Sequence, residues 1–394
     1  MSGVYIVGAA RTPIGKFLGS LGTLKASDLG AVAIKEALVR AGITGNDVDE
    51  VIMGHVVQAG QGQAPARQAM IKAGVNPVVG ALTINKVCGS GLKAVMLAAQ
   101  AIKAGDGDCI VAGGQESMST APHYMFGGRL GTRLGDVTLR DGVVYDGLWC
   151  SFNDCHMIEL AQYTAEKAGI KRDRIDEFSV ASQKKAAAAQ AAGAFDKEMA
   201  NVTIPQRKGD PIVVSKDESV RGDTTIEGLA KLGPVTKAKD GVITAGNAPG
   251  LNDGGAALVL MSEARVKATG AKPLARVTGY ATGGGEPKDL FFAPIDAVQK
   301  LMKKLSVDIN HFDLIEANEA FAAQALADGD GLGWDWDRVN VNGGAVALGH
   351  PIGASGARIL TTLLYALEAR GKKTGMATLC LGGGNAVALS VERV

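Results

Sequence analysis

The chain carries little net charge, few cysteines and no long hydrophobic run. Lys and Arg number 41 and Asp and Glu 40 among 394 residues. The sequence therefore lacks the basic excess of a protein that coats nucleic acid or binds anionic lipid. No uninterrupted apolar stretch approaches the ~18 residues that a membrane span needs. We expect a soluble globular protein with neither a nucleic acid nor a membrane as its partner.

Cysteine is too sparse and too unevenly spaced for a secreted disulfide framework. The first fifteen residues also lack the apolar core of a signal peptide. Both observations predict a reducing, cytoplasmic location. A C-x4-C-H spacing at 150–156 has no second ligand pair nearby, so no metal site is predicted. The cysteines are Cys88, Cys109, Cys150, Cys155 and Cys380.

Glycine, in contrast, is abundant. It makes up nearly 14% of the chain (54 residues of 394), against an average of about 7%. It occurs without a collagen period or low-complexity tracts, so it indicates tight turns and close backbone approach. The length allows two or three domains.

An internal repeat organises the chain. Residues 46–57 (NDVDEVIMGHVV) correspond to 310–321 (NHFDLIEANEAF), and residues 89–114 correspond to 353–384. Each longer segment contains a Gly/Ser turn, an apolar helix, a glycine stop and a strand that ends in glycines. The chain therefore consists of two similar halves.

The first half contains a long insertion. A final strand follows directly on Gly382 in the second copy, but its counterpart, which starts at Gly254, comes some 140 residues after the strand that it should follow. We predict an N-terminal half of residues 1–116 plus 254–272, an inserted cap of residues 117–253, and a C-terminal half of residues 273–394.

The alternation of strands and helices predicts an α/β protein with mostly parallel sheets. The helix that follows Gly91 is apolar or small on nearly all sides, which is typical of a buried helix. Two sheets around central helices, with further helices outside, give a five-layered α/β/α/β/α arrangement.

Four short segments each place a reactive side chain among small residues at the end of an element: Cys88, Asn318, His350 and Cys380. Cys88 stands where a strand passes into the buried helix, and we expect the helix dipole to favour its thiolate. The glycines beside it allow a planar thioester to approach, and backbone N–H groups there can hold an oxyanion.

Each of these residues also has an ordinary structural interpretation. Cys380 fits an inert core cysteine, His350 before Pro351 fits a turn residue, and Asn318 fits a helix N-cap. Their combination argues for function. Asn318, His350 and Cys380 are expected at strand ends of one repeat and Cys88 at a strand end of the other, and ligands gather at the carboxyl ends of parallel strands.

The motifs CGSGL, NEAFA, GHPIGASGAR and CLGGG, in this order, resemble the thiolase family of the biosynthetic acetoacetyl-CoA type over essentially the whole chain. The resemblance implies duplicated βαβαβαββ halves in the five-layered sandwich, with an inserted α+β cap. It also implies an acetyl-CoA C-acetyltransferase that condenses two acetyl-CoA molecules or thiolyses a 3-ketoacyl-CoA.

By the same resemblance, Cys88 accepts the acyl group, His350 takes the proton of that thiol, and Cys380 deprotonates the second acetyl-CoA. His350 and a water held by Asn318 form one oxyanion site, and the N–H groups of Cys88 and Gly382 form the other. Coenzyme A thioesters are substrates, and no metal or redox cofactor is implied.

The resemblance also implies contacts to pantetheine and acyl groups. Arg221 is expected at the nucleotide end of coenzyme A, although a solvated loop charge explains it equally well. Pro249, Ile158 and Asn385 depart from the family pattern, and Pro249 has no N–H to offer the pantetheine. The expected contacts are Leu148, His156, Met157, Ala245, Ala248, Pro249, Leu290 and Phe321.

Two other functions compete with this one. A condensing enzyme of the ketosynthase kind shares the repeat architecture, but Cys380 argues against it. A catalytically idle acyl-CoA-binding relative is the alternative of a different class. Residues 122–136 resemble the loop through which family members form dimers of dimers, so a homotetramer is expected.

Overall fold

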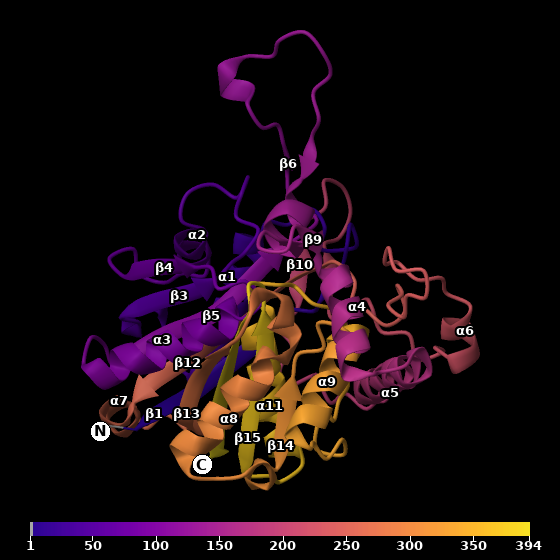
Figure 1. Ribbon diagram of the computed structural model, residues 1–394. Coiled ribbons are helices and arrows are strands. Elements are labelled where there is room, and N and C mark those ends of the chain that lie inside the picture. Colours follow the sequence, from indigo (N-terminus) through magenta and orange to yellow (C-terminus); the bar gives the residue numbers. More distant parts are fainter. Residues whose placement is uncertain (1–2) are drawn as a thin grey trace.

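The two halves each build a mixed sheet, and the two sheets meet edge to edge (Figure 1). A computed structural model describes residues 3–394. The strands run in the order β4-β3-β5-β12-β1-β13-β16-β15-β14. The edges of β1 and β13 join through two residue pairs. These strands are β1 (Val4–Arg11), β3 (Glu50–Gly54), β4 (Gly80–Ile84), β5 (Cys109–Ser117), β12 (Asn252–Ser262), β13 (Ala275–Gly284), β14 (Leu314–Ala317), β15 (Thr374–Leu381) and β16 (Asn385–Arg393).

Strand pairing confirms the duplication. In the first half, β3 is parallel to β5, β5 is antiparallel to β12, and β12 is antiparallel to β1. In the second half, β14, β15, β16 and β13 repeat this pattern. The counterpart of β4 is reduced to a parallel bridge between Ile315 and Val339.

The expectation of mostly parallel sheets is wrong. Antiparallel pairings hold β12 and β16 to both of their neighbours. The reason lies in the connections, because the three residues Gly382–Gly384 between β15 and β16 are too few for a parallel crossover.

Helices separate and cover the sheets in five layers, as predicted. Helices α3 (Ser90–Ala104) and α11 (Ser355–Ala369) lie between the two sheets and share one apolar core with both. Helices α1 (Ala26–Ala41) and α2 (Pro65–Lys72) cover the outer face of the first sheet, and α8 (Ala293–Leu305) covers that of the second.

The segment between β5 and β12 contains three helices and three small hairpins, and α4 and α5 pack against α9 (Ala322–Leu332) of the second half. The insertion thus covers one end of the duplicated core. Its elements are α4 (Met157–Ala168), α5 (Arg172–Ala191), α6 (Ile226–Ala230), β6 (His123–Tyr124), β7 (Arg140–Asp141), β8 (Trp149–Cys150), β9 (Cys155–His156), β10 (Val202–Ile204) and β11 (Ile212–Val214). The remaining elements are β2 (Gly15–Lys16), α7 (Glu263–Thr269), α10 (Ala345–Leu348) and helical turns at Gly45–Asp47, Gly128–Leu130, Val144–Leu148, Pro287–Phe292 and Ile309–His311.

Glycine allows the two central helices to touch. A Cβ on Gly91 of α3 would lie 2.7 Å from the backbone nitrogen of Ala357, and one on Gly356 of α11 would lie 2.4 Å from the nitrogen of Leu92. Both distances are shorter than van der Waals contact, so a side chain at either position would push the helices apart. The first turns of both helices adjoin the residues described next.

Candidate active site

One cavity of about 360 Å³ brings together residues from both halves and from the insertion. Cys88, His350, Cys380 and Gly382 all line it. Seven of the expected pantetheine and acyl contacts also line it, namely Leu148, His156, Met157, Ala248, Pro249, Leu290 and Phe321. Most of the remaining wall is apolar and was not anticipated from sequence, including Met118, Phe291 and Ile352.

Cys88 lies in a tight turn between β4 and α3. The hydroxyl of Ser90 accepts the Lys86 N–H at 2.8 Å and donates to the Val87 carbonyl at 2.6 Å, and Val87 has a left-handed backbone with φ of 47°. A Cβ on Gly89 would lie 2.1 Å from the Leu381 side chain, so a larger residue does not fit there. The turn thus holds the half-buried Cys88 at the cavity wall.

The Cys88 thiol is protonated at neutral pH, contrary to the thiolate expected from the helix dipole. Burial raises the pKa of Cys88 to about 12, and the buried Glu116 carboxylate adds to the rise. The backbone N–H groups of Gly382 and of Cys88 itself point at the sulfur and lower its pKa, but desolvation is the larger effect. These are the two N–H groups expected to form an oxyanion site.

His350 is held as a neutral imidazole in one tautomer. Its Nδ1 lies 2.6 Å from the Ser355 hydroxyl, which itself donates to the Pro351 carbonyl at 2.9 Å. The hydroxyl proton is therefore engaged, so Nδ1 carries the ring proton and Nε2 is free to accept one. Burial, aided by the nearby Arg358 guanidinium, lowers the pKa of His350 to about 3.

His350 stands in the loop between α10 and α11, so the prediction that it lies at a strand end is wrong. A residue that sequence reasoning did not assign anchors this loop. The backbone N–H of His350 donates to the side-chain oxygen of Asn252 at 2.9 Å. Asn252 lies in none of the four motifs that carry the family resemblance.

Asn318 immediately follows β14, and its Nδ2 lies 3.5 Å from Nε2 of His350. The structural interpretation of Asn318 as a helix N-cap is wrong, because Phe321 occupies the N-cap of α9. The Asn318 side-chain oxygen is buried and has no hydrogen-bond partner among residues 3–394. Buried polar atoms of this kind often hold an ordered water.

Cys380 is the penultimate residue of β15 and is buried. Burial raises the pKa of its thiol well above the ordinary value, and the Cys88 sulfur and the Asp328 carboxyl raise it further. Two neutral thiols and a neutral imidazole thus face a mostly apolar cavity. Such a site favours chemistry in which protons pass between these groups and a bound substrate.

Two expected substrate contacts lie outside the cavity wall. Ala245 is exposed on a turn, and Arg221 is an exposed residue whose backbone N–H donates to the Gln183 side chain. Both stay predictions for the outer part of a long ligand. His156 caps α4 by accepting the Ile158 N–H on Nδ1 at 3.1 Å, and burial lowers the pKa of its ring.

Glu116 was also missed. Its buried carboxylate accepts the backbone N–H groups of Val56, Val57 and Gly353, and it lies 3.3 Å from the His55 ring. It thereby ties the loop that carries His350 to the strand ends of the first half. Within residues 3–394, no cluster of three His, Cys, Asp or Glu side chains is arranged to hold a metal ion. In the same residues, no helix is both long and apolar enough to cross a bilayer.

Comparison with known proteins matches the chain along its length. A family model described as the N-terminal domain of thiolase matches residues 4–264, and one described as the C-terminal domain matches residues 271–393. An acetyl-CoA acetyltransferase of Cupriavidus necator is 55% identical over 393 residues, and one of Escherichia coli is 52% identical over 395 residues, each alignment covering 100% of both chains. The crystal structure of the Bacillus anthracis acetyl-CoA acetyltransferase superposes with a TM-score of 0.98 at 42% identity, over 100% of this chain and 99% of that one.

Proposed function

The chain belongs to the thiolase family, and from this membership and the geometry of its cavity we propose that it is an acetyl-CoA C-acetyltransferase. It condenses two acetyl-CoA molecules to acetoacetyl-CoA and coenzyme A, or runs the reverse thiolysis of a 3-ketoacyl-CoA. The observation that carries the proposal is that Cys88, His350 and Cys380 line one cavity.

Acyl transfer to Cys88 is the first step. Because the resting thiol is neutral, it must lose its proton as it attacks the thioester, and Nε2 of His350 is the unprotonated acceptor in the same cavity. The sulfur–carbon bond forms, coenzyme A leaves as its thiolate, and that thiolate takes the proton back from His350. An acetyl-Cys88 thioester and free coenzyme A result.

The backbone N–H groups of Cys88 and Gly382 are the proposed donors to the oxyanion of this step. Both N–H groups lower the pKa of the Cys88 sulfur, which supports their use by the carbonyl oxygen of an acyl group bound to it. Removing one such donor from an enzyme typically lowers the rate about 10²- to 10³-fold. The chain needs no metal or redox cofactor for this step, because fixed N–H groups stabilise the charge.

Carbon–carbon bond formation follows. Nε2 of His350, unprotonated again after the first step, takes the proton of the Cys380 thiol in the same cavity. The Cys380 thiolate so formed takes a proton from the methyl group of the second acetyl-CoA, whose enolate attacks acetyl-Cys88. The Cys88 thiolate leaves and takes its proton back from His350. The Nε2–H of the imidazolium formed in this way, with a water bound to the Asn318 oxygen that has no partner among residues 3–394, stabilises the enolate oxygen.

Accumulation of an acetyl group tests this proposal against the idle binding relative. Brief incubation with acetyl-CoA is expected to add one acetyl group to the tryptic peptide 87–93, which contains Cys88. The Cys88→Ser variant is the matched control and is expected to bind acetyl-CoA without this thioester. Binding with an unmodified Cys88 in the wild type would instead identify an acyl-CoA-binding protein.

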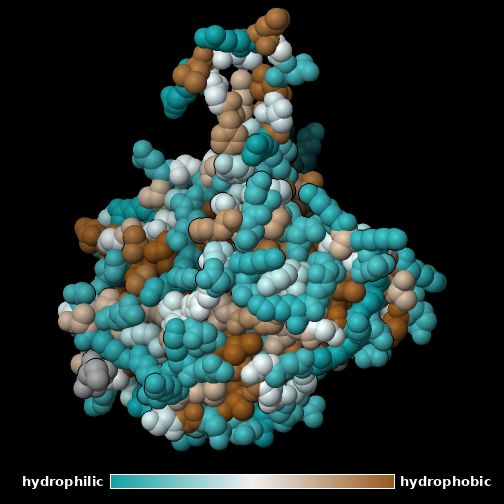
Figure 2. Space-filling model, viewed as in Figure 1, coloured by the Kyte–Doolittle hydropathy of each residue, from teal (hydrophilic) through white to brown (hydrophobic). Residues whose placement is uncertain are grey.

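We also propose a cytoplasmic homotetramer, a dimer of dimers assembled through the arm formed by residues 122–142. The arm stands clear of the body of the molecule (Figures 1 and 2). Leu130 and Leu134 near its tip are 88% and 107% exposed, and Met125 and Phe126 of the same arm are also exposed, so the arm carries several apolar side chains that a partner could cover.

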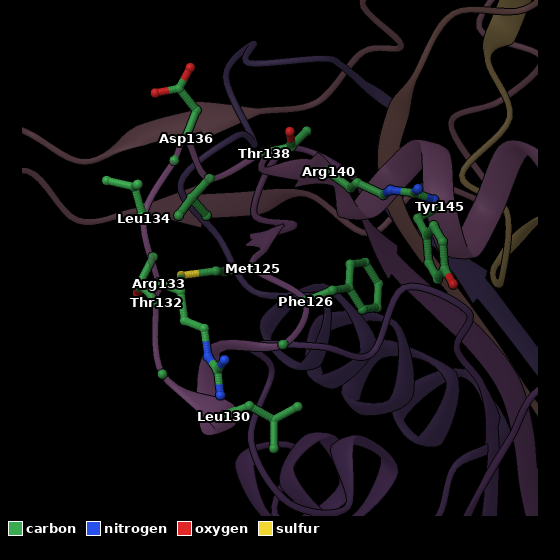
Figure 3. A pocket seen from close by; sticks show the side chains of 14 residues that line it. Met125, Phe126, Leu130, Thr132, Arg133, Leu134, Asp136, Thr138, Arg140 and Tyr145 are labelled. Atoms are coloured by element: carbon green, nitrogen blue, oxygen red, sulfur yellow. The ribbon is translucent and has the colours of Figure 1, made fainter.

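The inner face of the arm contains a concave surface on which the arm of a second copy could pack. An open cavity of about 930 Å³ lies within it, and Figure 3 shows Phe126, Arg140 and Tyr145 along one side. The Arg140 guanidinium lies 5.8 Å from the Phe126 ring centre and 5.7 Å from that of Tyr145. These cation–π contacts hold the base of the arm in shape for docking.

A further inference from the structure

The hairpin of β8 and β9 places two cysteines directly opposite each other. In its antiparallel register, Trp149 pairs with His156 and Cys150 pairs with Cys155. Directly paired residues of antiparallel strands have Cα atoms about 4.5–5.5 Å apart. That separation lies within the range of about 4.4–6.8 Å that the Cα atoms of a disulfide span, so the register of this hairpin is one that a disulfide can bridge.

The turn between the two cysteines is fixed by its own side chains. The Trp149 indole N–H donates to Asp154 at 3.0 Å, the Cys150 thiol donates to the Asn153 oxygen at 3.3 Å, and Asp154 adopts a left-handed φ of 47°. Cys150 is thereby kept in register with Cys155 while both are reduced. The entropy of bringing the two sulfurs together has already been lost on folding.

The two thiols differ in access. Cys150 is 2% exposed, whereas Cys155 is half-buried and can meet a small reagent from solvent. Burial raises the pKa of Cys155, and the second cause of that rise is Cys150 itself, which agrees with the strand register in placing the groups side by side. An attacking residue and a resolving residue are thus distinguishable.

We propose that Cys150 and Cys155 form a reversible dithiol–disulfide site on the hairpin that leads into the cavity wall at His156 and Met157. The oxidant is a small disulfide such as oxidised glutathione. Cys155 releases its proton to solvent and attacks one sulfur of the oxidant, giving a mixed disulfide and one thiolate. Cys150 then loses its proton, attacks the Cys155 sulfur and expels the second thiolate. The two released thiolates take up the two protons, so that two protein thiols become one disulfide and the oxidant becomes two thiols.

Tryptic mapping tests this site independently of any catalytic activity. Cleavage after Arg140 and Lys167 yields a peptide, 141–167, that contains these two cysteines, whereas Cys88, Cys109 and Cys380 fall in other peptides. After exposure of the folded protein to oxidised glutathione and alkylation of the remaining thiols, peptide 141–167 is expected to be lighter by two hydrogen atoms and unalkylated. Dithiothreitol is expected to restore both alkylation sites.

Two single variants distinguish the attacking cysteine from the resolving cysteine. In Cys150→Ser, Cys155 is expected to accumulate as the glutathione adduct because its resolving partner is gone. In Cys155→Ser, Cys150 is expected to stay alkylatable after unfolding because it is buried. The proposal is overturned if wild-type peptide 141–167 keeps two free thiols, or carries a stable glutathione adduct, under the conditions that modify Cys150→Ser.

Discussion

The hydroxyl of Ser355 decides which nitrogen of His350 can accept a proton. It accepts a hydrogen bond from the Nδ1–H of His350 and donates one to the Pro351 carbonyl, and Ser355 is fully buried. Without it, the neutral imidazole is free to adopt the other tautomer, which presents an N–H to the cavity in place of a lone pair. Ser355 is thus a positioning residue for His350.

Replacement of Ser355 by Ala is therefore expected to lower kcat for acetoacetyl-CoA thiolysis about 10- to 100-fold, with little change in KM. This loss is smaller than the roughly 10²- to 10⁴-fold typical of general acid–base catalysis, because the variant keeps His350 itself. Thr361→Ala is a matched control, because Thr361 makes the same kind of buried bond to a carbonyl four residues earlier in α11 but lies away from the cavity. Equal losses in both variants would mean that Ser355 acts through helix stability alone.

Burial of Cys88 also predicts a pH dependence. Because the pKa is raised to about 12, the thiolate fraction keeps growing with pH across the neutral range. The rate constant for alkylation of Cys88 by iodoacetamide is expected to rise about tenfold per pH unit between pH 7 and 9. Quenched samples read at peptide 87–93 give this rate, and a plateau reached below pH 7 would show instead that the free protein holds a thiolate.

The first turns of helices α3 and α11 adjoin the turn that holds Cys88 and the loop that holds His350, and the close contact of the two helices sets where those turns lie. Gly356→Ala would place a methyl group 2.4 Å from the Leu92 nitrogen. Overpacking of this kind destabilises a fold by about 1–3 kcal/mol, so the midpoint of thermal unfolding is expected to fall by several degrees. Displacement of Ser355, the neighbour of Gly356, is expected to lower kcat as well.

Gly80→Ala provides the control for that substitution. Gly80 begins β4, is exposed, and has nothing within 4 Å of the position of an added Cβ. Its free energy of unfolding is expected to change by no more than about 0.5 kcal/mol, as for ordinary surface substitutions, so its midpoint of thermal unfolding should stay close to that of the wild type. A Gly356→Ala protein as stable as Gly80→Ala would contradict the close packing of the central helices.

The repeated sequence segments predicted where the helices and strands lie better than they predicted whether neighbouring strands run parallel or antiparallel. The apolar surface of the helix after Gly91 predicted α3 at the centre of the molecule, because all-round burial leaves a local compositional signal. The antiparallel pairing of β12 had no such signal, since strand direction depends on where the chain returns after the insertion.

In the candidate site, too, local sequence motifs were predictable and contacts made only on folding were not. The cysteines and His350 stand in short glycine-rich segments that sequence alone singled out, whereas Asn252 and Glu116 act through contacts made only on folding. The protonation of Cys88 was predicted wrongly for a related reason. The sequence indicates a neighbouring helix dipole, but the desolvation that outweighs it depends on the packed cavity.

The molecule as a whole presents one long feature with no counterpart in the repeated core, the arm of residues 122–142 (Figure 2). Tyr124 and Arg140 pair across its base, so an Asn-Gly turn in place of residues 125–139 can close the hairpin. This variant is expected to sediment as a dimer where the wild type sediments as a tetramer, with the Cys88 acetylation retained.

A second variant keeps the full length of the arm, so it controls for misfolding caused by the loop replacement. Leu130→Asp combined with Leu134→Asp keeps the arm but places charge on its most exposed apolar residues, and it is expected to give the same dimer. Tetramers that persist in both variants would rule out assembly through the arm.

The central claim is that Cys88 carries the acyl group and Cys380 forms the enolate. A Cys380→Ser variant tests this claim most directly, because it separates acylation from condensation. Cys109→Ser is the control for loss of a buried cysteine outside the cavity. After incubation with isotopically labelled acetyl-CoA, both variants are expected to carry the label on peptide 87–93. When unlabelled acetyl-CoA follows, the control should release labelled acetoacetyl-CoA, whereas Cys380→Ser should form none and return its label only as acetyl-CoA or acetate. Labelled acetoacetyl-CoA from Cys380→Ser at the wild-type rate would show that another group forms the enolate.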